Sequence, residues 1–116
     1  TPARSQVNVV RMGERKRVTN PAGPEVLEVL AGSRLLQATQ VEIEPEHSCD
    51  RNGDTDGTEL FMYVLQGQLE MTCNEKTFLL RAGDSAQDDG SRTRRFRNIG
   101  ESRDLVLEVV SSCSAS

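Results

Sequence analysis

The chain is poor in lysine and has no long apolar run. It contains only two lysines, Lys16 and Lys76, and carries a formal net charge of -4 at pH 7. It therefore lacks the strongly basic face that neutralises a phosphate backbone, and we expect no direct binding of nucleic acid. No apolar run approaches the about 20 residues that cross a bilayer, and the first residues lack the regions of a signal peptide. We expect a soluble, cytoplasmic protein with no membrane contact.

Histidine and cysteine are also scarce. The single histidine, His47, lies in the polar segment 42–51, where a lone imidazole is more often solvated than functional, so we assign it no role. The three cysteines, Cys49, Cys73 and Cys113, are widely spaced. Zinc sites and redox motifs need closer pairs, so we expect these cysteines to be reduced thiols without a function.

The length and the polar ends indicate the domain organisation. A chain of 116 residues suffices for one domain, because a chain of this size buries roughly two thirds of its unfolded surface. Polar composition at both ends predicts flexible segments over residues 1–6 and 111–116. Residues 7–110 then form a single domain.

Short apolar stretches separated by turn residues predict an all-β fold. We expect no helix, and strands over Asn8–Arg11, Val26–Leu30, Leu35–Ile43, Glu59–Leu65, Gln68–Cys73, Lys76–Leu80, Asp84–Gln87, Arg92–Arg97 and Leu105–Val110. Turns rich in Gly, Asn, Asp and Pro separate these runs. Regular spacing of this kind is typical of a sandwich or a barrel.

One predicted strand is apolar on both faces. Leu60, Met62 and Val64 alternate with Phe61, Tyr63 and Leu65. Because both faces of such a strand need to be covered, we expect one face to line the barrel and the other to pack in a homodimer.

Several segments resemble the cupin family. Residues 58–70 resemble the first cupin motif, in which a strand runs through a glycine turn into a second strand, and Gly83-Asp84 with residues 95–98 resemble the second motif. The resemblance implies a double-stranded β-helix, the jelly-roll barrel of cupins. Residues 17–23 and 35–45 also resemble the lead-in to the cupin domain of helix-turn-helix regulators of the XRE type. In those regulators a DNA-binding domain precedes a cupin domain that is thought to sense a small ligand.

The metal ligands of the family are missing from this sequence. In metal-binding cupins, the first motif supplies two histidines and a glutamate, and the second motif supplies a third histidine. The matching positions here hold Asp54, Asp56, Leu60 and Arg94. Leu60 offers no ligand atom, and Arg94 places a fixed positive charge at the fourth position, so we expect neither a metal nor another cofactor.

The arginine at the last position has two possible roles. In the first, Arg94 ties the two motifs together by facing Asp54 and Asp56; in the second, its guanidinium group binds a carboxylate or phosphate of a small ligand. The two roles are compatible, since a sensor can exchange an internal ion pair for a bound anion. The predicted ligand-binding residues are those of the motif positions and their apolar neighbours: Asp54, Asp56, Leu60, Met62, Gln87, Arg94 and Phe96.

Other charged groups receive simpler interpretations. Asp50, Asn52, Gly53 and Asp54 resemble the start of a calcium loop, but the glycine comes one place too early and strands flank the segment, which favours a polar loop at the barrel mouth. The arginine-rich stretch 92–97 alternates between the faces of its strand, so we expect a salt-bridged edge rather than a basic site.

Three functions are compatible with these residues. The first is a metal-free domain that senses a small, anionic molecule and dimerises as part of a transcriptional regulator, with no catalytic residue. The second is a stand-alone isomerase or epimerase that works on a small anionic substrate without metal, although candidate acids and bases are few. The third is a structural or partner-binding domain with a filled interior.

Overall fold

The computed structural model describes residues 7–19, 25–54 and 56–112. Ten strands and one three-residue 3-10 turn, Met12–Glu14, make up the regular structure of this part of the chain. The strands are β1 (Lys16–Thr19), β2 (Val26–Val29), β3 (Leu36–Ile43), β4 (Ser48–Arg51), β5 (Thr58–Gln66), β6 (Gln68–Cys73), β7 (Lys76–Arg81), β8 (Ser85–Asp89), β9 (Arg94–Asn98) and β10 (Asp104–Ser112).

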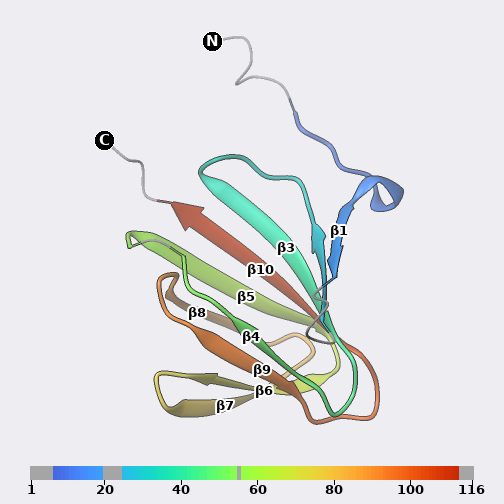
Figure 1. Cartoon of the computed structure of the whole chain (residues 1–116), viewed down its shortest axis with the longest axis vertical. Helices are drawn as coiled ribbons and strands as arrows, with labels where there is room; N and C mark the ends of the chain where they lie inside the picture. Colours follow the sequence, from blue (N-terminus) through green and yellow to red (C-terminus); the bar gives the residue numbers. More distant parts are fainter. Residues whose placement is uncertain (1–6, 20–24, 55, 113–116) are drawn as a thin grey trace.

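The strands form two antiparallel sheets that face each other (Figure 1). The larger sheet has the order β1-β2-β3-β10-β5-β8, and the smaller sheet has the order β4-β9-β6-β7. Strands far apart in sequence are neighbours, since β10 pairs with both β3 and β5. The predicted all-β jelly-roll architecture is confirmed.

Alternating burial shows which side chains fill the space between the sheets. In β5, Leu60, Met62 and Val64 are buried, while Phe61 and Leu65 are exposed. The same alternation runs along β6, β9 and β10, as expected where one face of each sheet is covered. The core consists of apolar residues from both sheets: Val41, Ile43, Cys49, Leu60, Met62, Val64, Leu69, Met71, Phe96 and Val106.

The structure differs from the sequence prediction in two edge strands that were not predicted and in one predicted strand that does not form. β1 and β4 are absent from the prediction, and residues 8–11 precede a 3-10 turn instead of forming a strand. All four residues of β1 are exposed, and β4 has the polar sequence Ser-Cys-Asp-Arg. Neither has a clear apolar alternation, so pairing with a neighbouring strand decides their conformation.

The chain ends fall partly outside the described residues. Ser111 and Ser112, which the prediction assigned to a flexible tail, belong to β10, where Ser111 is opposite Leu36 and Glu59. Residues 1–6 and 113–116, including Cys113, lie outside the described part, so the flexibility predicted for them stays a prediction. No helix among the described residues is long and apolar enough to span a membrane.

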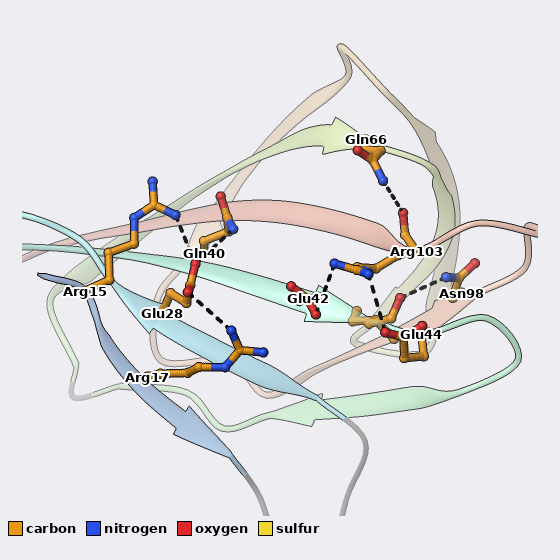
Figure 2. Close-up of polar contacts among 10 residues, drawn as sticks. Arg15, Arg17, Glu28, Gln40, Glu42, Glu44, Gln66, Asn98 and Arg103 are labelled. Carbon is orange, nitrogen blue, oxygen red and sulfur yellow. Dashed lines mark hydrogen bonds and ion pairs between the residues drawn. The ribbon is translucent and has the colours of Figure 1, made fainter. Parts of the chain in front are cut away.

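The outer face of the larger sheet is polar on one half. In Figure 2, Glu28 of β2 accepts hydrogen bonds from Arg15 at 3.0 Å and from Gln40 of β3 at 3.4 Å, and it pairs with Arg17 at 3.7 Å. Arg103 pairs with Glu42 and Glu44, each at 3.5 Å. The outer side chains of β5 and β10 differ, because Phe61, Leu107 and Val109 lie there. This half of the face is apolar.

Candidate functional site

A buried carboxylate shared by two arginines lies between the sheets. Glu108 accepts hydrogen bonds from Nε and Nη2 of Arg94 at 2.8 and 2.6 Å through Oε2. Its Oε1 accepts from Nε and Nη2 of Arg51 at 2.9 and 2.8 Å. The side chains of Arg94 and Glu108 are only 3% and 1% exposed. We refer to these three residues as the arginine–glutamate cluster.

Strand register places the three side chains of this cluster. Arg51 of β4 and Arg94 of β9 are direct partners across the smaller sheet, where two like charges would repel each other. Glu108 comes from the opposite sheet, at the position of β10 that pairs with Met62 and Thr39. Its carboxylate therefore compensates both guanidinium groups and joins the two sheets by charge-assisted hydrogen bonds.

One donor of the cluster remains unsatisfied. Nη1 of Arg94 is buried and has no hydrogen-bond partner among the described residues. A buried N–H without an acceptor destabilises the protein by about 1–3 kcal/mol, and more when the group is charged. An acceptor that reached this nitrogen would remove the penalty.

A hollow of about 580 Å³ opens beside the cluster. Small-molecule sites generally fall in the range of about 300–1,000 Å³. The walls combine charged, polar and small apolar side chains from both sheets and from the loop after β4: Val18, Thr19, Glu25, Leu27, Gln37, Thr39, Asp50, Arg51, Asn52, Gly53, Asp54, Arg94, Glu108 and Val110. Among the hollows of the described structure, this one contains the motif arginine, and we take it as the candidate site.

The buried acids affect a thiol close to the hollow. Burial raises the pKa of Cys49 to about 12, and the negative charges of Glu25 and Glu108 add to this effect, while Arg51 opposes it. The thiol is therefore protonated at neutral pH and is a poor nucleophile. Cys49 and Cys73 are both free; that the three cysteines are reduced thiols without a function stays a prediction.

The structure brings together only part of the predicted ligand-binding set. Arg94 and Asp54 line the hollow. Leu60, Met62 and Phe96 are 0–1% exposed and belong to the packed core. Asp56 is exposed and is not part of the wall.

Gln87, which the sequence prediction placed among the ligand-binding residues, does not line this hollow. It is opposite Phe61, on the outer face of the larger sheet. Its amide nitrogen donates to Glu59 at 3.2 Å. Strand parity near the turn at 88–90 could not be assigned from sequence alone, so the sequence did not show on which face Gln87 lies.

The predicted partner of Arg94 is wrong. Nε and Nη2 bond Glu108, and Nη1 has no partner, so Arg94 makes no hydrogen bond to Asp54 or Asp56. The prediction missed Glu108 and Arg51. A signal for Glu108 was present, because it is the one charge in the apolar run 105–110 and shares the inward parity of Val106.

The motif positions do not fit a metal ion. Leu60 has no donor atom, and Arg94 holds its positive charge against Glu108 at the position of the last histidine. Within the described residues, no group of three or more His, Cys, Asp or Glu side chains could hold a metal. A divalent transition metal prefers imidazole, thiolate and carboxylate ligands, so this donor set is unsuitable.

The remaining charged groups lie outside the hollow or face solvent. Arg95 points away from Arg94 and makes an exposed pair with Asp50, with Nε at 2.7 Å from Oδ1. His47 is exposed, with Nδ1 at 3.0 Å from the carbonyl of Pro45. Neither observation gives these groups a role in the candidate site.

The sequence model of the Cupin_2 family, described as a cupin domain, matches residues 39–111. The chain belongs to the cupin family. The matched part of this cupin includes β4, β9 and β10, which supply all three residues of the arginine–glutamate cluster. No curated protein matches the sequence.

Solved structures of two regulators resemble this cupin. The Cupin_2 domain of an XRE family transcriptional regulator from Enterobacter cloacae superposes with a TM-score of 0.74 at 14% identity, over 78% of this chain and 99% of the other. An HTH_3 family transcriptional regulator from Vibrio cholerae has a TM-score of 0.72 at 13% identity, over 81% of this chain. The cupin spans 55% of that regulator.

An enzyme also resembles this cupin. A predicted oxalate decarboxylase from Thermotoga maritima has a TM-score of 0.71 at 21% identity, over 91% of this chain and 100% of the other. The fold is thus shared with regulators and with enzymes, and identities this low show the fold alone.

Proposed function

We propose that this cupin is a metal-free domain that senses a small anionic molecule and dimerises within a transcriptional regulator. Such a regulator acts in the cytoplasm, and its DNA-binding domain lies outside this sequence. The resemblance to the cupin domain of an XRE family regulator, which this chain covers almost entirely, supports the regulator assignment.

The unsatisfied nitrogen of Arg94 carries the sensing part of the proposal. It is a cationic donor at the motif position where relatives hold a histidine ligand, and its side chain lines the hollow. A carboxylate or phosphate oxygen is the natural acceptor for a guanidinium N–H. Because Glu108 already binds two other donors of Arg94, the fork is held in one orientation before a ligand arrives, which reduces the entropy lost on binding.

An enzyme that works without metal is the second candidate, favoured by the resemblance to a predicted oxalate decarboxylase. Isomerases and epimerases need a general acid and a general base, commonly His, Tyr or Lys. The described walls of the hollow contain none of these three residue types. Tyr63, which could serve as an acid, lies on the outer face opposite Leu107. We therefore rank the enzyme second.

The dimerisation part rests on the apolar half of the outer face of the larger sheet. Phe61 is 42% exposed and is opposite Val109 of β10, and Tyr63 is opposite Leu107. A second copy of the same face would cover these side chains, as in an isologous dimer.

Thermal shift with a panel of small carboxylic acids tests the sensing role. The panel contains keto, hydroxy and amino acids at millimolar concentration, and we expect at least one to raise the Tm of the parent protein, because a ligand that binds only the folded state stabilises it. Arg94→Ala should abolish the shift, and Arg94→Lys should weaken it, since lysine keeps the charge but not the fork.

The exposed Arg97 provides the matched control. Arg97→Ala removes a guanidinium of the same strand that faces away from the hollow and does not line it, so its response should equal that of the parent. A full response of folded Arg94→Ala, or no response of the parent to any acid, would contradict the proposal.

A further inference from the structure

A second hollow opens where the edge strands β7 and β8 face each other. Each of these strands is the last of its sheet, and in the described structure the two are not hydrogen-bonded to each other. The hollow has a volume of about 400 Å³, which lies within the range of about 300–1,000 Å³ typical of small-molecule sites. Among the described residues, it shares no lining residue with the hollow beside the arginine–glutamate cluster.

Inward-facing side chains make one part of the second hollow apolar. Phe78 of β7 is directly opposite the buried Met71 of β6, so the two side chains lie on the same face of the smaller sheet. Leu80 follows two residues later on that face, and Ala86 of β8 lines the hollow from the other sheet. Phe78 is nevertheless 46% exposed. An apolar group that covered this ring would remove both surfaces from water, which favours binding.

The other end of the second hollow carries the charged side chains. Lys76, two residues before Phe78 on β7, is directly opposite Cys73 of β6. The Cys73 thiol donates to Oδ2 of Asp88 at 3.1 Å. Oδ1 of Asp88 lies 4.0 Å from Nε of Arg92. Register and contacts therefore gather Lys76, Cys73, Asp88 and Arg92 at one end of the hollow.

Positive charge is in excess at this end. Lys76 and Arg92 are cationic, and Asp88 is the one carboxylate of the described lining, since the neighbouring Glu75 does not line the hollow. Burial and the contact with Asp88 raise the pKa of Cys73, so this thiol stays protonated at neutral pH and adds no negative charge. Asp88 already has Cys73 and Arg92 as partners. Lys76 is exposed and has no hydrogen bond or ion pair with the rest of the described chain.

We propose that the second hollow binds a small amphiphilic anion, namely an aliphatic monocarboxylate of the fatty-acid type. Its carboxylate pairs with the ammonium group of Lys76. Its hydrocarbon chain lies along Phe78, Met71 and Leu80, between the two edge strands. A sugar or a nucleotide would leave these apolar walls without a partner. This site is independent of the proposed sensing function, because it uses none of the residues beside Arg94.

Calorimetric titration with aliphatic probes tests this proposal. The probes are butyrate, hexanoate and octanoate, with 1-octanol and octylammonium as the neutral and cationic counterparts of octanoate. We expect the affinity to rise along the acids by roughly fourfold for each methylene that is buried. Octanoate should bind about fivefold more tightly than octanol or octylammonium, because it alone can pair with Lys76.

The two lysines of the chain provide a matched pair of variants. Lys76→Ala should weaken octanoate binding about fivefold and remove the preference for octanoate over octanol. Lys16→Ala is the control, because Lys16 is exposed on β1 and does not line the second hollow. It should bind like the parent.

Two neighbours on β7 test the apolar wall in the same way. Phe78→Ala should weaken octanoate binding about fivefold, since the truncated side chain covers less of the hydrocarbon chain. Leu79→Ala is the control, because Leu79 is similarly exposed, at 49%, but does not line the second hollow. Its affinity for octanoate should equal that of the parent.

The outcomes separate this site from the proposed sensing site. No binding of octanoate to the folded parent, or an affinity that does not rise with chain length, would overturn the second site. Equal affinities of Lys76→Ala and Lys16→Ala would overturn the pairing with Lys76. Lys76→Ala should keep the parent's Tm response to the keto, hydroxy and amino acids. If that response disappeared together with octanoate binding, the acids would share one site and the second site would not be independent.

Discussion

At the scale of single residues, the feature that defines this cupin is a charge cluster inside an apolar barrel. A buried carboxylate destabilises a protein by several kcal/mol unless it is paired and hydrogen-bonded. Glu108 meets this condition, because four N–H groups of Arg51 and Arg94 donate to its two oxygens. The two arginines in turn depend on it, since they are direct neighbours across β4 and β9.

Glu108→Gln should therefore be strongly destabilising. The amide keeps the shape of the side chain but leaves two guanidinium groups facing each other, and removal of one partner of a buried pair lowers the free energy of unfolding by about 3–5 kcal/mol. Urea denaturation measures the loss. Asp50→Asn is the control, because it breaks an exposed pair with Arg95 that contributes at most about 1 kcal/mol. Similar losses in the two variants would show that the buried cluster contributes little to stability.

At the scale of elements, a buried acid joins the β5–β6 turn to the start of β10. Gly67 has a φ of +92°, a conformation that glycine adopts without strain. A Cβ at this position would also collide with the Asp104 carboxylate. Asp104 is fully buried, and its Oδ1 accepts from the backbone N–H of Gln68 at 2.9 Å. Its Oδ2 has no hydrogen-bond partner in the described part of the chain.

This acid should make stability fall as the pH rises from about 4 to about 7. Burial raises the pKa of Asp104 from 3.8 to about 7, although the bond from Gln68 opposes the rise. The folded state thus binds this proton more tightly than the unfolded chain, so the stabilisation is complete below pH about 4 and is lost through pH about 7. Asp104→Asn should remove this slope in urea denaturation curves recorded between pH 4 and pH 8.

Asp89 offers a control of opposite sign. It is exposed, and hydrogen bonds from the backbone N–H and the hydroxyl of Ser91 lower its pKa. Its contribution is present above the unfolded pKa and lost as the pH falls. Asp89→Asn should therefore keep the downward slope of the parent between pH 4 and pH 7. If the stability of the Asp104→Asn variant still fell with rising pH as steeply as that of the parent, Asp104 would not be the group responsible.

The sequence predicts the inner strands better than the edge strands. β6 alternates apolar and polar residues, and β5 contains a continuous apolar run; both patterns reflect strands with one face over the core. β1 and β4 carry mostly polar residues at the ends of the sheets. β1 pairs only with the next strand, β2, and the partner of β4, β9, lies far away in sequence. Propensity alone therefore does not identify them.

The sequence also predicted only part of the candidate site. The family motif identifies Arg94, and the structure places it between the sheets. Its partner, Glu108, is 14 residues away on the opposite sheet. The contact depends on how the two sheets face each other, which no local pattern records. The loop position of Asp54 was predicted, but its separation from Arg94 was not.

At the scale of the whole molecule, the two halves of the outer face of the larger sheet differ. Charged pairs around Glu28 and Arg103 cover one half, as Figure 2 shows. Phe61, Tyr63 and their β10 partners, Val109 and Leu107, form the other half. Large exposed apolar patches on small proteins commonly mark interaction surfaces. The proposed dimer would use the apolar half.

Phe61→Asp should convert the proposed dimer into a monomer, because a charge would be buried at the centre of the interface without a partner. Sedimentation velocity measures the mass in solution. Leu79→Asp is the control, since Leu79 is 49% exposed on the smaller sheet and should leave the dimer intact. A monomeric parent, or a soluble Phe61→Asp protein with the parent's mass, would contradict the dimer.

Strand β10 has side chains on both sides of the larger sheet. Glu108 points inward to Arg94, whereas Leu107 and Val109, its neighbours along the chain, lie on the outer face. Under the proposed function, a ligand that binds the Arg94 guanidinium changes its contact with Glu108 and so shifts β10. The second subunit packs against the outer face of the same strand. Effector affinity and subunit association are then linked reciprocally, so dilution of the protein should weaken ligand binding by the same factor by which the ligand tightens the pair.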